Sequence, residues 1–124
     1  MTKRPLISVI DDDESIRESI AGLANWLGLG VEAFDSAIAF LSAAEPSGSA
    51  CIIADVQMPG MTGIELYSHL KALGHTVPTI LITAYPDDTA RARALAEGVV
   101  CYLSKPLESA VLIGCIRSAM RLQP

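Results

Sequence analysis

The sequence has no long apolar run, so a membrane-spanning helix is not expected. Such a helix needs about 18 or more consecutive apolar residues, and the apolar runs here are interrupted well before that length. The first of them, residues 6–10, leads directly into four acidic residues. This run therefore predicts a first strand rather than a signal peptide, and we expect a cytoplasmic protein without membrane contact.

The sequence also has little positive charge and few cysteines. Its net charge is −5 and it contains no basic run, so direct binding of nucleic acid is not expected. The cysteines Cys51, Cys101 and Cys115 lie in apolar surroundings without CxxC spacing, which predicts reduced, buried, structural thiols. No Walker loop or glycine-rich phosphate cradle is present, which argues against a nucleotide or flavin cofactor.

What the sequence does have is regular alternation of apolar strands and helical segments. Hydrophobic residues make up 51% of the 124 residues, enough for one domain with a sizeable core. The predicted strands are residues 6–10, 31–34, 51–55, 79–83 and 99–104. Most are apolar throughout, as in parallel sheets, whereas residues 31–34 alternate like an edge strand. We predict an α/β, flavodoxin-like (βα)5 fold, with a parallel sheet in the order 2-1-3-4-5 and helices on both faces.

The last two helices have contrasting apolar faces. The fourth helix is rich in alanine, so it is expected to pack weakly and to shift at modest cost. In the fifth, Leu107, Val111, Cys115 and Ala119 are predicted to form one buried stripe.

Acidic residues follow two of the predicted strands. Asp11 and Asp12 come directly after the first strand, and Asp55 ends the third. In the predicted order these strands are neighbours about 4.8 Å apart, so the three carboxylates converge. Their mutual repulsion favours a bound divalent cation, and an all-oxygen ligand set suits Mg²⁺. Asp13 and Glu14 are expected instead to cap the following helix and to interact with its dipole.

Two further polar residues reach the same edge of the sheet. Thr83 ends the fourth strand, where its hydroxyl could donate to a phosphoryl oxygen. Lys105 follows the fifth strand, and Pro106 biases it toward an extended backbone that directs it to the acids. The two histidines, His69 and His75, are expected on an exposed helix face and in a loop, not as ligands or phosphate carriers.

Together these motifs resemble the receiver domain of bacterial two-component response regulators, and the sequence is similar to receivers joined to LuxR-type helix-turn-helix domains. The resemblance rests on Asp11-Asp12-Asp13, on Asp55 with Met58-Pro59-Gly60, on Thr83-Ala84, and on Tyr102 with Lys105-Pro106. It covers the chain from end to end and implies one receiver domain over residues 1–124.

The resemblance implies that Asp55 takes a phosphoryl group from the phosphohistidine of a sensor histidine kinase, or from a small donor such as acetyl phosphate. It also implies a magnesium ion, replaceable by manganese. Asp12, Asp55 and the main-chain carbonyl of Gln57 would hold this ion, with Asp11 acting through water. Such a protein catalyses only its own phosphorylation and dephosphorylation and is not otherwise an enzyme.

The family also implies a signalling response. Thr83 and Lys105 would bind the phosphoryl oxygens, and Tyr102 would turn inward as Thr83 moves. The fourth helix, fifth strand and fifth helix would then report to a C-terminal DNA-binding output domain or another partner, and the chain would homodimerise on phosphorylation. Gln57 and Tyr85 are expected to tune the phosphoryl lifetime, with Tyr85 leaning over the group.

Two alternatives remain open at this point. The chain could be a receiver-like interaction module that is never phosphorylated, although its complete set of acids and lysine argues against this. It could also be a small phosphatase with Asp11 as its nucleophile. That alternative leaves Asp55 without a role, and 124 residues leave no room for a large cap.

Overall fold

The predicted alternation of strands and helices is present in the computed structural model, which describes residues 4–43 and 48–121. The strands are β1 (Leu6–Ile10), β2 (Gly30–Phe34), β3 (Cys51–Asp55), β4 (Thr79–Thr83) and β5 (Cys101–Ser104). The helices are α1 (Glu14–Trp26), α2 (Ala37–Ala43), α3 (Gly63–Ala72), α4 (Asp88–Glu97) and α5 (Ser109–Arg121). The rest of the predicted domain over residues 1–124 lies outside the described residues. Within the described ranges, no helix has both the length and the apolar character needed to cross a bilayer.

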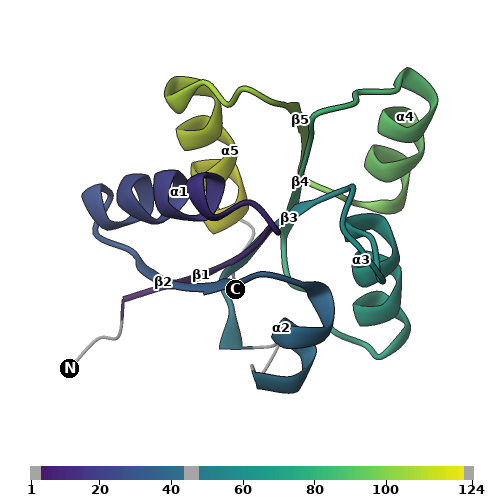
Figure 1. Cartoon of the computed structure of the whole chain (residues 1–124), viewed down its shortest axis with the longest axis horizontal. Helices are drawn as coiled ribbons and strands as arrows, with labels where there is room; N and C mark the ends of the chain where they lie inside the picture. The colour runs from purple at the N-terminus through teal and green to yellow at the C-terminus, as the bar shows by residue number, and fades with distance from the viewer. Residues whose placement is uncertain (1–3, 44–47, 122–124) are drawn as a thin grey trace.

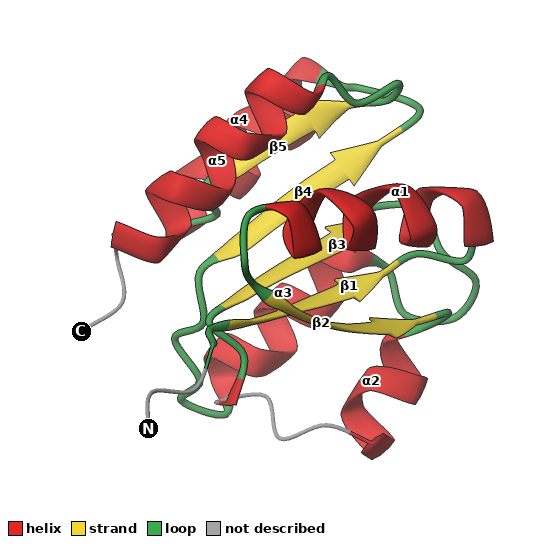
Figure 2. Cartoon of the chain, turned by 90° about the vertical axis from the view of Figure 1, so that its left-hand side faces the viewer, coloured by secondary structure: helices red, strands yellow, loops and turns green. Residues whose placement is uncertain are grey.

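The five strands form one parallel sheet in the order β2-β1-β3-β4-β5, which confirms the predicted topology. In Figure 2 all the strand arrows point the same way, with helices on either side of the sheet. β1 and β3 pair directly, so that Ile10 lies opposite Ala54 although 44 residues separate them in sequence. The carboxyl ends of these strands therefore meet at one edge of the sheet.

Two apolar cores cover the two faces of the sheet. Strands β3 and β4 are buried at every position, as their continuous apolar runs predict. Helices α1 and α5 cover one face, where Ile53 lies, and α2, α3 and α4 cover the other, where Ile52 lies (Figure 1). Neighbouring residues of β3 thus point to opposite faces, as the period of a strand requires.

The buried face of α5 differs from the prediction. The helix begins at Ser109, so Leu107 precedes it, and Val111 is 46% exposed. Its buried residues are Leu112, Cys115, Ile116 and Ala119. The predicted stripe is confirmed for Cys115 and Ala119 and wrong for Leu107 and Val111, because steps of four residues drift by about 40° each around a helix with 3.6 residues per turn. The observed spacing of three, one and three stays on one face.

The predicted state of two cysteines is also wrong. Cys101 on β5 and Cys115 on α5 form a disulfide, with their Cα atoms 6.3 Å apart. Their spacing of 14 residues gave no signal, because the fold and not the local sequence brings them together. Cys51 is free and buried, as expected.

The start of α3 packs directly against the end of β3. The Thr62 side chain accepts from the Glu65 N–H, while Glu65 accepts from the Thr62 N–H, so the two residues form a capping box. Gly63 then approaches the backbone of Asp55 so closely that a Cβ at this position would lie 2.9 Å from the Asp55 carbonyl carbon. Only glycine allows this approach, so Gly63 helps to fix the position of Asp55.

We expect Gly63→Ala to destabilise the protein by about 1–3 kcal/mol, the usual effect of overpacking. Gly114→Ala is the matched control, because Gly114 lies inside α5 with nothing within 4 Å of its would-be Cβ. That change should be neutral or stabilising by up to about 1 kcal/mol. Urea unfolding midpoints measure both effects, and equal midpoints for the two variants would contradict the close approach at Gly63.

Candidate functional site

Three carboxylates meet at the carboxyl edge of the sheet, as predicted. Asp11 follows β1 and Asp55 ends β3, and both are buried, with 0% and 4% of their surface exposed. Asp12 lies beside them and is exposed. One oxygen from each of the three side chains lies within 4.8 Å of the others, so this acidic triad is consistent with a metal site.

Lys105 joins the two buried acids. Its Nζ lies 3.0 Å from Asp11 Oδ2 and 3.0 Å from Asp55 Oδ2. The Lys105 N–H donates to the Thr83 carbonyl, and a cis peptide bond leads into Pro106. Burial alone would lower the pKa of Lys105, but its hydrogen bonds and ion pairs with Asp11 and Asp55 raise it overall. The ammonium is therefore charged at neutral pH.

Asp11 is only partly compensated. Its Oδ1 accepts from the Asp13 N–H at 2.9 Å, whereas its Oδ2 is close to Lys105 but lacks a hydrogen bond of good geometry. Burial raises the pKa of Asp11, and the charge of Asp55 adds to this, despite the hydrogen bond from Asp13 and the nearby Lys105 ammonium. Asp13 itself caps α1 as predicted, and its hydrogen bonds from Ser15 lower its pKa.

The Asp55 side chain is held at both oxygens. Its Oδ1 accepts from the Gln57 N–H at 3.1 Å, and its Oδ2 accepts from Lys105. Each carboxylate oxygen thus has its own donor. One donor lies on the loop after β3 and the other follows β5. The Gln57 main chain lies next to the acid at the rim of the site.

Thr83 lies on the same edge but points its hydroxyl to a partner that sequence reasoning missed. The fully buried side chain donates from Oγ1 to Gln57 Oε1 at 2.6 Å and accepts from the Tyr85 N–H at 3.0 Å. Both hydrogen-bonding roles of the hydroxyl are therefore occupied. Nothing in the spacing of Gln57 and Thr83 signals this contact, because it depends on the side-chain rotamer of an exposed glutamine.

The remaining predicted residues are split between surface and core. Tyr85 is 74% exposed, whereas Tyr102 is only 7% exposed and packs inward, on the face covered by α2, α3 and α4. His69 is exposed near the end of α3, and His75 lies in the loop before β4, as expected.

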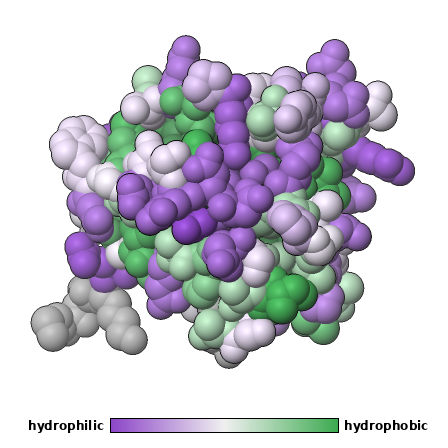
Figure 3. Space-filling view, viewed as in Figure 1, coloured by the Kyte–Doolittle hydropathy of each residue, from purple (hydrophilic) through white to green (hydrophobic). Residues whose placement is uncertain are grey.

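Figure 3 shows hydrophilic residues gathered across the middle of one face of the molecule, with hydrophobic areas beside them.

Comparison with known proteins identifies the family. The model of the response regulator receiver domain matches residues 7–117. The chain belongs to this family. The receiver is 37% identical over 119 residues to the response regulator protein TodT of Pseudomonas putida, covering 96% of this chain and 52% of that protein. It is 40% identical over 121 residues to the transcriptional regulatory protein FixJ of Bradyrhizobium diazoefficiens, covering 98% and 59%.

A solved structure gives the same fold. The crystal structure of FixJ-N superposes with a TM-score of 0.85 at 31% identity, covering 99% of this receiver and 98% of that chain. The receiver spans a little over half the length of the curated relatives it matches. Membership of this family makes the chain a two-component receiver and not a classical enzyme, which removes the phosphatase alternative.

The raised pKa of Asp11 predicts a specific pH dependence in the metal-free receiver. Because the folded pKa lies above the unfolded one, the Asp11 contribution to stability is full below the unfolded value near pH ~4 and is lost as pH rises through the folded pKa. Asp11→Asn removes this titration. In EDTA, the variant should therefore be more stable than the parent at pH 7, with an advantage that shrinks toward pH 4.

Urea unfolding from pH 4 to 8 measures this difference. Asp13→Asn is a control with the opposite pH dependence. The lowered pKa of Asp13 stabilises the folded receiver at pH values above the unfolded pKa, and this stabilisation is lost in acid. An Asp11→Asn variant that is less stable than the parent at pH 7 would contradict the assignment.

Proposed function

We propose that this receiver accepts a phosphoryl group on Asp55 in a magnesium-dependent reaction and so relays a signal from a sensor histidine kinase. The observation that carries the proposal is the buried Asp55 carboxylate with the Lys105 ammonium 3.0 Å away, beside two further carboxylates. A carboxylate can act as a nucleophile toward phosphorus. The adjacent cation reduces the electrostatic repulsion that would otherwise keep a phosphoryl group away.

The residues at the site fit a divalent cation. Asp12, Asp55 and the main-chain carbonyl of Gln57 would bind Mg²⁺ or Mn²⁺, with Asp11 acting through water. Two observations support this fit: the donors are all oxygens, and the buried Asp11 Oδ2 lacks a hydrogen bond. When bound, the ion supplies positive charge that lowers the barrier to approach of the phosphoryl oxygens.

The transfer itself exchanges one bond to phosphorus for another. An oxygen of Asp55 bonds to phosphorus while the bond to the donor breaks, either to the imidazole nitrogen of phosphohistidine or to the acyl oxygen of acetyl phosphate. The bonding electrons leave with the donor. Lys105 stays in place and neutralises charge on the transferred group, so the protein contributes positioning and electrostatics.

The hydrogen bond between Thr83 and Gln57 gives the site a response to this reaction. In order to bind a phosphoryl oxygen, the Thr83 hydroxyl must leave Gln57 Oε1. Hydrogen bonds to charged acceptors are roughly twice as strong as neutral ones, so the exchange is favourable. The released Gln57 amide is exposed and can bond to water. Gln57 thereby tunes how readily Thr83 responds.

The signal would continue through Tyr102 and α4. Tyr102 lies inward in this structure, and Ala94 is the sole buried residue of α4, as expected for a weakly packed helix. The C-terminal end of α4 is held from α3, where Tyr67 Oη and Lys71 Nζ both donate to the Glu97 carbonyl. A movement of α4 would thus pivot on this end, changing the surface formed by α4, β5 and α5.

That surface is the proposed contact for the output. The matched residues make up only 52% of TodT and 59% of FixJ, which supports a C-terminal DNA-binding domain or a separate partner as the recipient of the signal. Residues 1–124 would form the single receiver domain, acting in the cytoplasm. Phosphorylation would promote homodimerisation.

Incubation with acetyl phosphate and Mg²⁺ tests the acceptor. Intact-mass measurement should show addition of one phosphoryl group, which Asp55→Asn abolishes because the nucleophile is gone. Asp12→Asn should lower the extent of modification, since it removes one proposed metal ligand from an exposed position. An unmodified parent, with a cognate kinase also tried, would favour the interaction module that is never phosphorylated.

Tyr85 provides a test of phosphoryl lifetime. We expect Tyr85→Ala to speed dephosphorylation several-fold, because the Tyr85 main chain contacts Thr83 and its exposed ring would shield the phosphoryl group from water. Tyr85→Phe is the matched control and should retain the parent rate, since it keeps the ring. Rates follow from the loss of phosphoprotein mass after removal of the donor. An unchanged or slower rate for Tyr85→Ala would overturn the shielding role.

A further inference from the structure

We propose that Cys101 and Cys115 form a reversible thiol–disulfide site that sets how firmly α5 is held against β5. This site is separate from Asp55 and would give the receiver a second, redox input. Three features of the structure support it: the geometry of the pair, the exposure of one partner, and the protection of the third cysteine.

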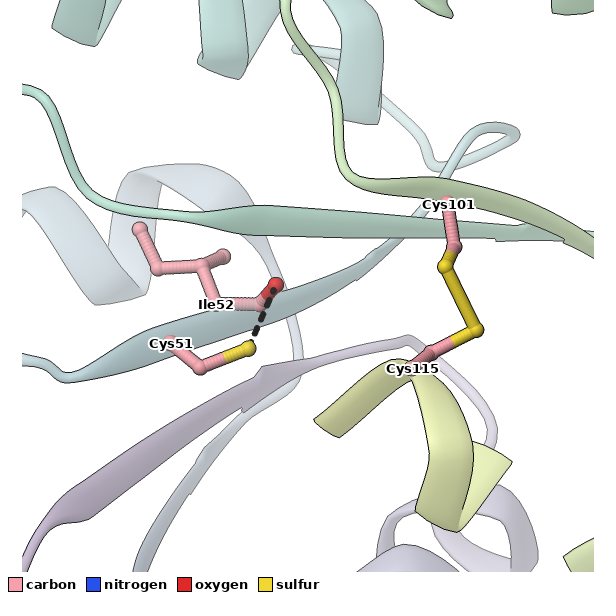
Figure 4. Close-up of a disulfide and its surroundings, with 4 residues drawn as sticks. All are labelled: Cys51, Ile52, Cys101 and Cys115. Carbon is pink, nitrogen blue, oxygen red and sulfur yellow. Dashed lines mark hydrogen bonds between the residues drawn. A yellow bond between two sulfur atoms is a disulfide. The ribbon is translucent and has the colours of Figure 1, made fainter. Parts of the chain in front are cut away.

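The geometry allows the bond to form and break without rearrangement of the backbone. The Cα atoms of the pair lie 6.3 Å apart, inside the range of about 4.4–6.8 Å found for disulfides. Alternation along β5 directs Cys101 toward the α5 face of the sheet and Tyr102 toward the opposite face. Cys115 lies on the buried stripe of α5, facing the strand (Figure 4).

The pair is accessible at one end. β5 is the last strand of the sheet, and Cys101 near its start is partly exposed, whereas Cys115 is 8% exposed. A small thiol or disulfide can therefore reach Cys101 first. Figure 4 shows that the third cysteine, Cys51, lies apart from this pair on β3.

Cys51 is excluded from the exchange. It is completely buried, its Sγ donates a weak hydrogen bond to the Ile52 carbonyl at 3.8 Å, and burial raises the pKa of its thiol to about 12. The thiolate is the reactive form of cysteine, so a buried thiol that stays protonated does not compete. The exchange therefore involves one defined pair.

The oxidant we assign is a disulfide of low molecular mass, with oxidised glutathione as the example. The Cys101 thiolate attacks one sulfur of that molecule, which breaks its S–S bond, forms a mixed disulfide and releases one glutathione thiolate. The Cys115 thiolate then attacks Cys101 Sγ and releases the second. The two protein thiols lose two electrons and two protons, and the oxidant becomes two glutathione molecules; reduction is the reverse.

The disulfide restrains part of the proposed signalling surface, which is formed by α4, β5 and α5. The loop it closes, residues 101–115, contains Tyr102 and Lys105 and the first half of α5. A closed loop has fewer open conformations than a free one, so local opening of α5 away from β5 is suppressed in the oxidised form. In the reduced form α5 is held by packing alone.

Two measurements on the full chain test the proposal. The protein is equilibrated in mixtures of reduced and oxidised glutathione, alkylated with N-ethylmaleimide and weighed intact. Under reducing conditions at least one label, on Cys101, should enter the folded protein, and under oxidising conditions none, with Cys51 labelled only after unfolding. Hydrogen exchange of the α5 amides should be slower in the oxidised form. Cys101→Ser is the matched control and should abolish this difference; Cys115→Ala serves as a second variant.

Each outcome decides the proposal. A label count that does not change with the glutathione mixture, or a redox difference in α5 exchange that persists in Cys101→Ser and Cys115→Ala, would overturn it. Equal exchange of α5 in both redox states would overturn the mechanical role of the bond. Asp55→Asn should show the same redox titration as the parent, so failure of the phosphorylation proposal leaves this result intact.

Discussion

The ion pairs of Lys105 with Asp11 and Asp55 are the interactions on which the site depends. Two buried carboxylates repel each other, and an unpaired buried charge is strongly destabilising. A single ammonium 3.0 Å from both relieves this, but it comes from the end of β5, whereas the acids come from the ends of β1 and β3. The charge balance of the site therefore requires the order of the whole sheet to be correct.

Lys105 compensates the acids only in part, which is consistent with a metal site. Three carboxylates face one ammonium, which leaves two negative charges at an edge where Asp12 is exposed to solvent. In the proposed function a divalent cation would neutralise that excess. The raised pKa of Asp11 has the same cause, since burial without full compensation of the charge favours the neutral acid.

The sequence was sufficient to predict the sheet and the position of each acid, because both follow from short-range rules. The short apolar run of β3 is typical of a buried parallel strand, and Asp55 at its end must then lie at the carboxyl edge. Three features were beyond reach. The α5 stripe needed an accurate helical phase, the Cys101–Cys115 bond needed the packing of β5 on α5, and the Thr83–Gln57 bond needed a side-chain rotamer.

The Thr83–Gln57 bond also connects the loop after Asp55 with the end of β4. Thr83 is fully buried at the end of β4, so its hydroxyl needs a partner in every state of the protein. Gln57 supplies one in this structure, two residues beyond Asp55, and Lys105 is tied to the Thr83 carbonyl through its own N–H. In the proposed phosphorylation, a shift of the Thr83 hydroxyl toward a phosphoryl oxygen would therefore act on β5 as well as on β4. Tyr102, three residues before Lys105 and packed beside α4, lies where that shift would reach the surface.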